Sequence, residues 1–526
     1  MKTLLALLLA LCASLAHARD AALAKHFMVA AAHPLATEAG YDVLRRGGSV
    51  VDAAIAVQLV LGLVEPESSG IGGGAFLLHW SEGEKKLRSY DGRETAPAAA
   101  RPDRFLADGK PLAFFDAAVG GRSVGVPGVM RMLELAHQRH GRLPWAQLFQ
   151  PAIELAEKGF PLPPKLHALL QAEKIPLYEG KAPGDRIVNP AYAATLRALS
   201  AGGARALHQG PIALDIVQAV RMHARAGDLT AADMAAYRAV EREPVCGPYR
   251  VWRICSMGPP SSGGVAVLQI LGMLERTPFE TAPAQSAHAV HYFAEAGRLA
   301  YADRGRYLGD PDFVPVPVQR LLGSSYLSKR AQLIGEHSLR QALPGDAEGG
   351  TSHFSIVAAN GDALAMTTTI EAIFGSRIMV RGFLLNNQLT DFDFVPGSAN
   401  EVGPGKRPRS SMAPTMVFDR AGRLQLVVGS PGGSAIINYV AKTLVGVLDW
   451  KLDIQRAIEL PNFGSRNGPT QIERGTPFEK FAAPLAERGH QVELIRLRSG
   501  LHGIERVPGG WRGGADPRRE GLAKGD

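Results

Sequence analysis

The pattern of apolar and polar residues predicts a chain in which helices and strands alternate. A helix is expected between Pro34 and Gly47, because proline is favoured at a helix start and glycine just past its end. The almost entirely apolar stretch 49–66 predicts a second, buried helix. Residues 68–80 run from a glycine-rich loop into an apolar strand, whereas a phosphate-binding loop would lead into a helix. We therefore expect no nucleotide binding at these glycines.

Helical patterns continue through residues 125–240, and strand patterns dominate the chain after residue 351. Between these parts, residues 340–350 show no apolar periodicity and are expected to form an exposed, flexible linker. The segments expected to be strands in the last part are 353–358, 362–370, 423–429 and 491–497. Helices that flank two stacked sheets are the fold class these elements favour.

Composition predicts a globular protein with many tight turns. The 526 residues include 59 glycines and 36 prolines, and 46% of them are hydrophobic. The formal net charge is +8, but the basic residues are scattered in pairs such as Arg45-Arg46. No run reaches five like charges, so a nucleic-acid partner is not expected.

The first eighteen residues have the pattern of a secretory signal peptide. Lys2 precedes an apolar run, and Ala16 and Ala18 form a small-x-small cleavage site. A retained anchor is the alternative, although the cleavage site favours removal. No later segment approaches eighteen uninterrupted apolar residues, so we expect no membrane anchor after signal removal. The mature protein is expected to be periplasmic or secreted.

Two cysteines, Cys246 and Cys255, remain after signal removal. Two cysteines in a chain of this length do not make a disulfide scaffold. They flank two short predicted strands around a Gly-Pro turn, so one cross-strand disulfide is possible in an oxidising compartment. Two buried thiols are the alternative, and the sequence leaves both open.

A hairpin with threonines on both strands follows the predicted linker. Asn360-Gly361 is a strong signal for a two-residue turn between antiparallel strands. Such a turn would place Ser352 opposite Thr369, with Thr351 beside Thr369 to within about one residue of register. Two hydroxyl groups are therefore expected close together at one end of the hairpin.

Cleavage between Gly350 and Thr351 would give Thr351 two catalytic groups. A threonine hydroxyl is a weak nucleophile at neutral pH and needs a base. A free α-amino group has a pKa of about 7.7–8.0, which suits a general base near neutrality. The same hydroxyl could attack the Gly350 carbonyl to make an ester that water then opens. A Gly-Gly-Thr sequence before a strand is usually an ordinary loop, and that remains the alternative on spacing alone.

Seven ordered motifs give the chain a resemblance to the γ-glutamyltranspeptidase family. They are "PESSGIGGGAF", "DGRETAP", "YADRGRYLGDPDF", "TSHFSIVAANGDALAMTTTIEAIFG", "LLNNQLTDF", "KRPRSSMAPT" and "GSPGGS". Asp362 and Leu364 are mild departures from the family pattern. The resemblance implies an α+β N-terminal-nucleophile hydrolase, a four-layer αββα sandwich made as one precursor. It also implies a cut into a large subunit, 19–350, and a small subunit, 351–526, which then pair.

The resemblance implies a role for each candidate site residue. Thr351 is expected to be the nucleophile, with Thr369 hydrogen-bonded to its hydroxyl. The backbone N–H groups of Gly432 and Gly433 are expected to stabilise the oxyanion of the tetrahedral intermediate. A γ-glutamyl group carries an α-carboxylate and an α-ammonium, and both must be held. The residues expected to hold the carboxylate are Arg93, Ser410 and Ser411, and those expected to hold the ammonium are Glu371, Gln388 and Asp391.

The reaction that the resemblance implies is cleavage of the γ-glutamyl bond of glutathione and related compounds. The γ-glutamyl group would pass through an ester on Thr351 to water or to an amino-acid or peptide acceptor, with no metal or cofactor. The alternative is a glutaryl or cephalosporin acylase of the same fold. Glutaryl groups lack the α-amino group, so Glu371 and Asp391 favour the γ-glutamyl substrate. An exported binding protein without catalysis is a rival from another class, and it would remain uncut.

Overall fold

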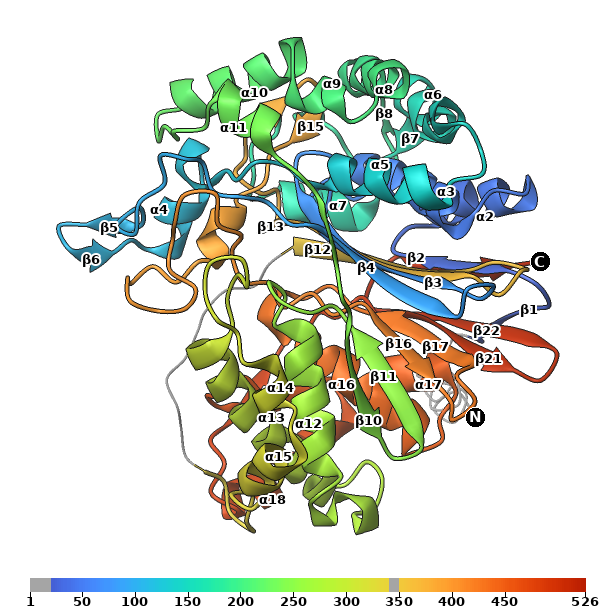
Figure 1. The fold of residues 1–526 in the computed structure, drawn as a ribbon, viewed down its shortest axis with the longest axis vertical. Helices are drawn as coiled ribbons and strands as arrows, with labels where there is room; N and C mark the ends of the chain where they lie inside the picture. The colour runs from blue at the N-terminus through green and yellow to red at the C-terminus, as the bar shows by residue number, and fades with distance from the viewer. Residues whose placement is uncertain (1–19, 340–349) are drawn as a thin grey trace, which may run out of the picture.

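The described elements of this computed structural model form four layers, with two sheets between two groups of helices (Figure 1). The structure describes residues 20–339 and 350–526. The predicted signal peptide and nearly all of the predicted linker lie outside these ranges. The layered arrangement confirms the four-layer αββα sandwich expected from the sequence.

Both main sheets have seven described strands, and every pair within them is antiparallel. The first sheet has the order β23 (Leu522–Gly525), β2 (Met28–Ala31), β12 (Gly350–Val357), β13 (Ala363–Glu371), β3 (Gly74–Ser81), β4 (Lys86–Gly92), β9 (Val240–Arg242). The second sheet has the order β1 (Ala22–Ala24), β22 (Gly510–Ala515), β21 (His502–Val507), β17 (Leu424–Gly429), β16 (Thr415–Phe418), β11 (Trp252–Ser256), β10 (Val245–Tyr249). The termini of the described chain therefore add edge strands to both sheets.

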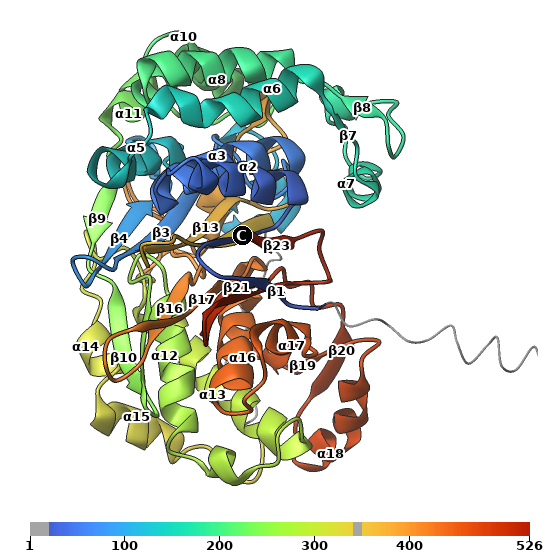
Figure 2. The ribbon, with the colours of Figure 1, turned by 90° about the vertical axis from the view of Figure 1, so that its right-hand side faces the viewer.

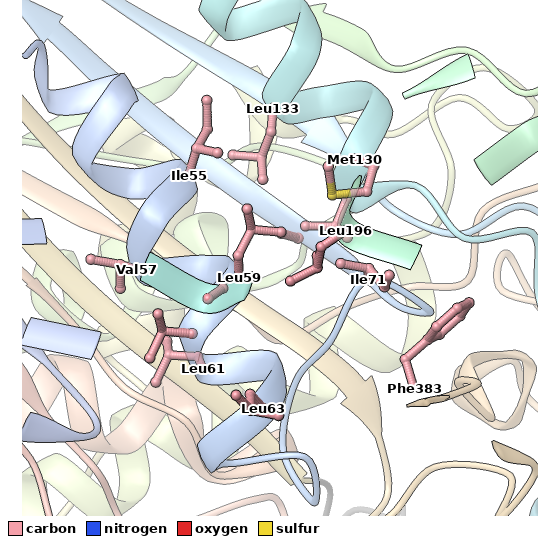
Figure 3. Close-up of a cluster of buried hydrophobic side chains, with 14 of the residues drawn as sticks. Ile55, Val57, Leu59, Leu61, Leu63, Ile71, Met130, Leu133, Leu196 and Phe383 are labelled. Carbon is pink, nitrogen blue, oxygen red and sulfur yellow. The ribbon is translucent and has the colours of Figure 1, made fainter. Parts of the chain in front are cut away.

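Helices from the first half of the chain cover the outer face of the first sheet (Figure 1). They are α2 (Pro34–Arg45), α3 (Val50–Val64), α5 (Val129–His140), α6 (Gln150–Lys158), α8 (Pro190–Gly202), α10 (Pro211–Met222). Every residue of α3 is buried, which confirms the buried helix expected here. Its start is fixed by Ser49 and Asp52, whose side chains each accept a hydrogen bond from the other's backbone N–H. Figure 3 shows Ile55 and Leu59 of α3 among the apolar side chains of this layer.

A second set of helices covers the outer face of the second sheet, as Figure 2 shows from the side. It includes α12 (Gly263–Leu274), α13 (Ala287–Tyr307), α15 (Ser324–Ala331), α16 (Ile436–Leu448) and α17 (Ile454–Glu459). The apolar core between the two sheets is smaller and includes Trp80, Phe418 and Trp511. Three apolar layers thus hold the four structural layers together, because each sheet buries both of its faces.

Side-chain alternation along β12 and β13 sends polar groups into the space between the sheets. Phe354 and Ile356 of β12 join the core on the helix side. The alternate residues Thr351, His353 and Ser355 therefore face the second sheet. His353 Nδ1 lies 2.8 Å from the Thr367 hydroxyl oxygen of β13. This end of the space between the sheets is polar, and it leads to the candidate site.

The β12–β13 hairpin forms as expected, but its register differs by one residue from the prediction. Thr351, not Ser352, lies opposite Thr369. The loop has three residues, because the Ala358 N–H donates to the Asp362 carbonyl and Gly361 adopts a positive φ of 87°. A three-residue loop that ends in a left-handed residue is a common hairpin type. The predicted two-residue turn was therefore wrong, since one more residue belongs to the loop.

Cys246 and Cys255 form a disulfide across β10 and β11, where they are directly opposite each other. Cys255 is buried, whereas Cys246 is exposed, so the alternative of two buried thiols was wrong. Within the described residues, each helix is too short or too polar to cross a lipid bilayer.

Candidate active site

Thr351 and Thr369 sit at the open end of the β12–β13 hairpin. The Thr351 hydroxyl donates to the Thr369 hydroxyl oxygen over 3.4 Å, and the latter also accepts from the Glu371 N–H at 2.8 Å. Thr351 is 3% exposed and Thr369 is 2% exposed. The pair is thus held in a fixed geometry by the ladder of two strands that are central in their sheet.

The backbone is irregular on both sides of this pair. The pairing of β12 with β13 shifts register between Gly350 and Thr351, the bond predicted to be cut. On the other strand, Glu371 has a positive φ of 78°, which is strained for a residue other than glycine. Bulges and strained residues are common beside active sites, where they direct a side chain away from the regular ladder.

A cavity of about 530 Å³ opens at this end of the hairpin. Nine of the ten predicted catalytic and substrate-binding residues line it, although they come from segments far apart in the chain. The nine are Thr351, Thr369, Glu371, Arg93, Gln388, Asp391, Ser410, Ser411 and Gly433. The structure therefore brings together almost the whole predicted site, and the exception is Gly432.

Arg93 and Asp391 form an ion pair in this cavity. An Arg93 Nη2 donates to Asp391 Oδ2 at 2.5 Å, and Gln388 Nε2 donates to the same oxygen at 2.8 Å. The Arg93 side chain is only 1% exposed, whereas that of Asp391 is 33% exposed. The pair presents one fixed positive and one fixed negative charge, which matches the two charges of an amino-acid head group.

Two further carboxyl groups near this pair have raised pKa values. Burial, together with the charge of Asp391, raises the pKa of Glu371 to about 8. Asn387 Nδ2 donates to Glu371 at 2.6 Å and fixes its orientation. Burial also raises the pKa of Glu94 to about 8, although Arg93 lowers it. Both carboxyl groups are therefore largely neutral at pH 7.

The predicted carboxylate-binding serines both accept hydrogen bonds from the protein. Ser410 Oγ accepts from the Met412 N–H at 3.1 Å, and Ser411 Oγ accepts from Arg304 Nη2 at 2.9 Å. Among the described residues, neither hydroxyl proton has an acceptor. Since a serine hydroxyl has one proton to donate, both protons are available for a group bound in the cavity.

Arg304 is a cavity residue that the sequence interpretation missed. It lies on α13, donates from Nε to Ser262 Oγ at 2.9 Å, and has no carboxylate within 4 Å in the described part of the chain. Burial and the nearby Arg409 lower its pKa to about 10, so it stays charged at neutral pH. Its presence in "YADRGRYLGDPDF" was a signal, but an arginine on a helix is more often a surface residue.

The two glycines of the predicted oxyanion turn line two different cavities. Gly433 lines the cavity together with Ser434, at the short 3₁₀ turn Gly433–Ala435 that precedes α16. Gly432 lines a different hollow. Its φ is 133°, and a Cβ atom there would lie 2.5 Å from the Tyr439 ring. Glycine is thus required at 432 by both conformation and space.

Comparisons with known proteins agree with this arrangement. The family described as gamma-glutamyltranspeptidase matches residues 36–525. A glutathione hydrolase proenzyme from Bacillus subtilis (strain 168) is 37% identical over 543 residues, covering 95% of this chain and 92% of that protein. An acylase ACY 1 proenzyme from Pseudomonas sp. (strain V22) is 35% identical over 514 residues, with coverages of 93% and 91%.

A solved structure extends the comparison to the fold. The crystal structure of a cephalosporin acylase from Bacillus halodurans has a TM-score of 0.87 to this chain at 27% identity, and 97% of each chain is covered. A glutathione hydrolase and two acylases are thus similar to this chain over nearly its whole length.

Proposed function

Since this chain belongs to the γ-glutamyltranspeptidase family, we propose that it cuts itself before Thr351 and then cleaves γ-glutamyl bonds. The single observation that carries this proposal is the position of Thr351. It lies opposite Thr369 on the wall of a cavity that also contains the Arg93–Asp391 ion pair. The similarity to its relatives supports a hydrolase or transferase as the class of enzyme. The geometry of the cavity supports recognition of an amino-acid head group in the substrate.

Self-cleavage would begin with the Thr351 hydroxyl. Its oxygen attacks the Gly350 carbonyl carbon, the C–N bond to Thr351 breaks, and the nitrogen takes up the hydroxyl proton to become an amine. Water then hydrolyses the ester, which leaves a carboxylate on residue 350 and a free hydroxyl on Thr351. The register shift between these two residues supports this step, because glycine tolerates the backbone distortion that the attack needs.

Substrate binding would use the charges already present in the cavity. The α-carboxylate would bind Arg93 and accept the free protons of Ser410 and Ser411. The α-ammonium would bind Asp391 and Glu371, with Gln388 holding Asp391 in place. A zwitterion adds no net charge to the cavity, so binding costs less desolvation than an unpaired ion would.

Catalysis would then proceed through an ester. The free α-amino group of Thr351 takes the proton of its own hydroxyl, whose oxygen attacks the γ-carbonyl carbon. Backbone N–H groups at Gly432 and Gly433 are proposed to stabilise the oxyanion. The leaving amine takes the proton as its bond breaks, and water or an acceptor amine removes the γ-glutamyl group in a second attack.

Intact mass analysis tests the proposal directly. The wild-type protein is expected to give two fragments that meet at Gly350–Thr351 and to hydrolyse γ-glutamyl-p-nitroanilide. Thr351→Ala should give one uncut, inactive chain, and Thr351→Ser should be cut and keep measurable activity. An uncut wild-type chain that is still active would refute the proposed mechanism.

An acylase acting on glutaryl groups is the second candidate, because acylases match this chain as fully as the glutathione hydrolase does. A glutaryl group has the carboxylate but not the ammonium. Asp391→Asn should therefore lower kcat/KM for a γ-glutamyl anilide much more than for a glutaryl anilide. Faster wild-type turnover of the glutaryl compound would favour the acylase.

We further propose that the protein acts in the periplasm or outside the cell. The pattern of residues 1–18 supports export. The Cys246–Cys255 disulfide also supports it, since such bonds persist mainly in oxidising compartments. Fractionation of cells that produce the protein, followed by N-terminal sequencing, would test both points.

A further inference from the structure

A second hollow lies behind the Gly432-Gly433 turn, outside the proposed catalytic cavity. Its volume is about 100 Å³, smaller than that of the main cavity. Gly432 lines this hollow, whereas Gly433 lines the main cavity, so the two spaces lie on either side of one turn. Apart from Gly432, whose backbone N–H is proposed to reach the oxyanion in the main cavity, no residue that lines this second space has a role in the proposed reaction.

Basic side chains dominate the lining of this hollow. Two of the contributing elements are α7 (Pro164–Leu170) and β20 (Val492–Ile495), with its following loop, and Figure 2 shows both on the same side of the molecule. In the part of the chain that the structure describes, the basic residues of the lining are Lys165, Arg466, Arg498, Arg518 and Arg519, and the acidic residue is Glu67.

Among the described residues, two of these cations have carboxylates within 4 Å. Lys165 Nζ lies 3.4 Å from Glu65 and 3.8 Å from Glu67. Arg518 pairs with Glu473 and Asp516 at 2.6 and 3.1 Å.

For the other three, Arg466, Arg498 and Arg519, the described residues provide no carboxylate within 4 Å. Three guanidinium groups around one small hollow repel each other, and an anion between them would remove that repulsion.

Neutral acceptors hold two of the unpaired guanidinium groups in place. Arg466 Nη1 donates to Ser434 Oγ at 2.7 Å. Arg519 Nη1 donates to Ser68 Oγ at 3.4 Å and to the Thr351 carbonyl oxygen at 3.1 Å. These bonds fix the positions of the charges without neutralising them. They also connect the hollow to the backbone of the proposed nucleophile.

Glu67 adds a feature that suits an anion. Its Oε2 atom is buried and has no hydrogen-bond partner in the described part of the chain. Burial and the neighbouring Glu65 raise the pKa of Glu67 to about 7, so a large fraction of it is protonated at neutral pH. A protonated carboxyl can donate a hydrogen bond to an anion, whereas an ionised one would repel it.

We propose that this hollow is an anion-binding site, which takes a carboxylate or phosphate group between Arg466, Arg498 and Arg519. Guanidinium groups suit such ligands because their planar N–H pairs match two oxygen atoms. Apolar residues such as Leu169 and Leu497 line the rest of the hollow and would contact the body of an organic anion. The group belongs either to a free anion or to the carboxylate tail of a peptide substrate that passes the turn.

Calorimetric titration with inorganic phosphate at constant ionic strength tests the site without relying on catalysis. Saturating L-glutamate is added to occupy the main cavity. The wild-type protein is expected to bind one phosphate per chain, and the double variant Arg466→Gln/Arg498→Gln to bind it at least tenfold more weakly. Arg423→Gln, an exposed arginine paired with Asp419, is the matched control and should bind as the wild type does. Thermal unfolding confirms that each variant is folded.

A second measurement identifies the source of the anion, and it rests on the proposed function. Two γ-glutamyl donors are compared whose leaving dipeptides end in a carboxylate or in an amide. If the double variant loses kcat/KM only for the carboxylate donor, the ligand is the substrate tail. If the ratio of kcat/KM for the two donors is the same in the double variant as in the wild type, and the wild type binds phosphate, the ligand is a free anion. Phosphate binding that glutamate abolishes, or that the double variant retains, overturns the proposal.

Discussion

Thr351 and Thr369 occupy opposite positions on β12 and β13, with their hydroxyl oxygens 3.4 Å apart. A pair fixed by a strand ladder needs little reorganisation before a reaction, which is an advantage for catalysis. The same two strands connect the pair to Glu371 at one end and to the buried His353–Thr367 contact further along. The proposed nucleophile is therefore held by the pairing of β12 with β13, although the backbone is irregular at Gly350 and Glu371.

Removal of the Thr369 hydroxyl should slow both self-cleavage and turnover. Thr369→Val keeps the shape but leaves the Thr351 hydroxyl without its partner. We expect kcat to fall roughly 10²-fold, the lower end of what a positioned proton-transfer group contributes. Intact mass at timed intervals measures self-cleavage, and p-nitroanilide release measures turnover. Thr369→Ser should restore most of both rates, and an equal loss in the serine variant would contradict this role.

Arg304 should act through Ser411 on binding of the α-carboxylate. An arginine has only donors, so it forces Ser411 to accept and leaves the hydroxyl proton for the substrate. Arg304→Gln should raise KM for γ-glutamyl-p-nitroanilide about tenfold, or about 1.4 kcal/mol, with kcat changed little.

The effect should vanish with 4-aminobutyryl-p-nitroanilide, which lacks the α-carboxylate. Arg306→Gln, an exposed position on the same helix, is the control. If Arg304→Gln raises KM for both p-nitroanilide donors by the same factor, Arg304 has only a structural role.

Binding of L-glutamate should become tighter as the pH rises towards 8.5. The pKa of Glu371 is raised to about 8, so the ionised form that attracts an ammonium group increases roughly tenfold per pH unit below that value. The titration therefore predicts weak binding at pH 6.5 and near-maximal binding above pH 8.

Self-cleavage would give Thr351 an α-amino group that is expected to titrate in the same range, so Glu371→Gln is the necessary comparison. The Glu371→Gln variant should bind L-glutamate more weakly than the wild type does, and its affinity should lose most of the pH dependence. An unchanged pH profile in this variant would show that Glu371 is not the titrating group.

The buried amino group of Lys442 should lower the free energy of unfolding most at low pH, where it carries a charge. Burial, with Arg518 nearby, lowers its pKa from 10.5 to about 7. Between these values the unfolded chain binds a proton that the folded chain does not, so stability rises as the pH rises from 7 to 10.5. Below pH 7 the full cost of a buried charge is present.

Lys442→Met should therefore raise the free energy of unfolding by roughly 1–3 kcal/mol at pH 6, and the gain should shrink by pH 9.5. The Ile458 and Leu460 carbonyl groups that Lys442 contacts keep Arg518 as a donor. Urea unfolding at both pH values measures the effect. A loss of stability at pH 6 would mean that these two hydrogen bonds outweigh the cost of the buried charge.

The sequence by itself determined the local features of this protein. Apolar periodicity and the Asn360-Gly361 turn predicted the buried helix and the hairpin, whereas the resemblance of the ordered motifs to a known family implied the residues of the site. Local patterns succeed here because they report which face of an element is buried and where the chain turns. They also indicated that Thr351 and Thr369 share one end of the hairpin.

Only the tertiary structure decided the exact register and the contacts across the cavity. Ala359 joins Asn360 and Gly361 in the loop and so shifts the pairing by one, and turn residues alone do not distinguish loops of two and three residues. Arg93 meets Asp391 across 298 positions of sequence, and Arg304 meets Ser411 across 107. Such contacts depend on how two sheets and their helices pack, which no local pattern of residues specifies.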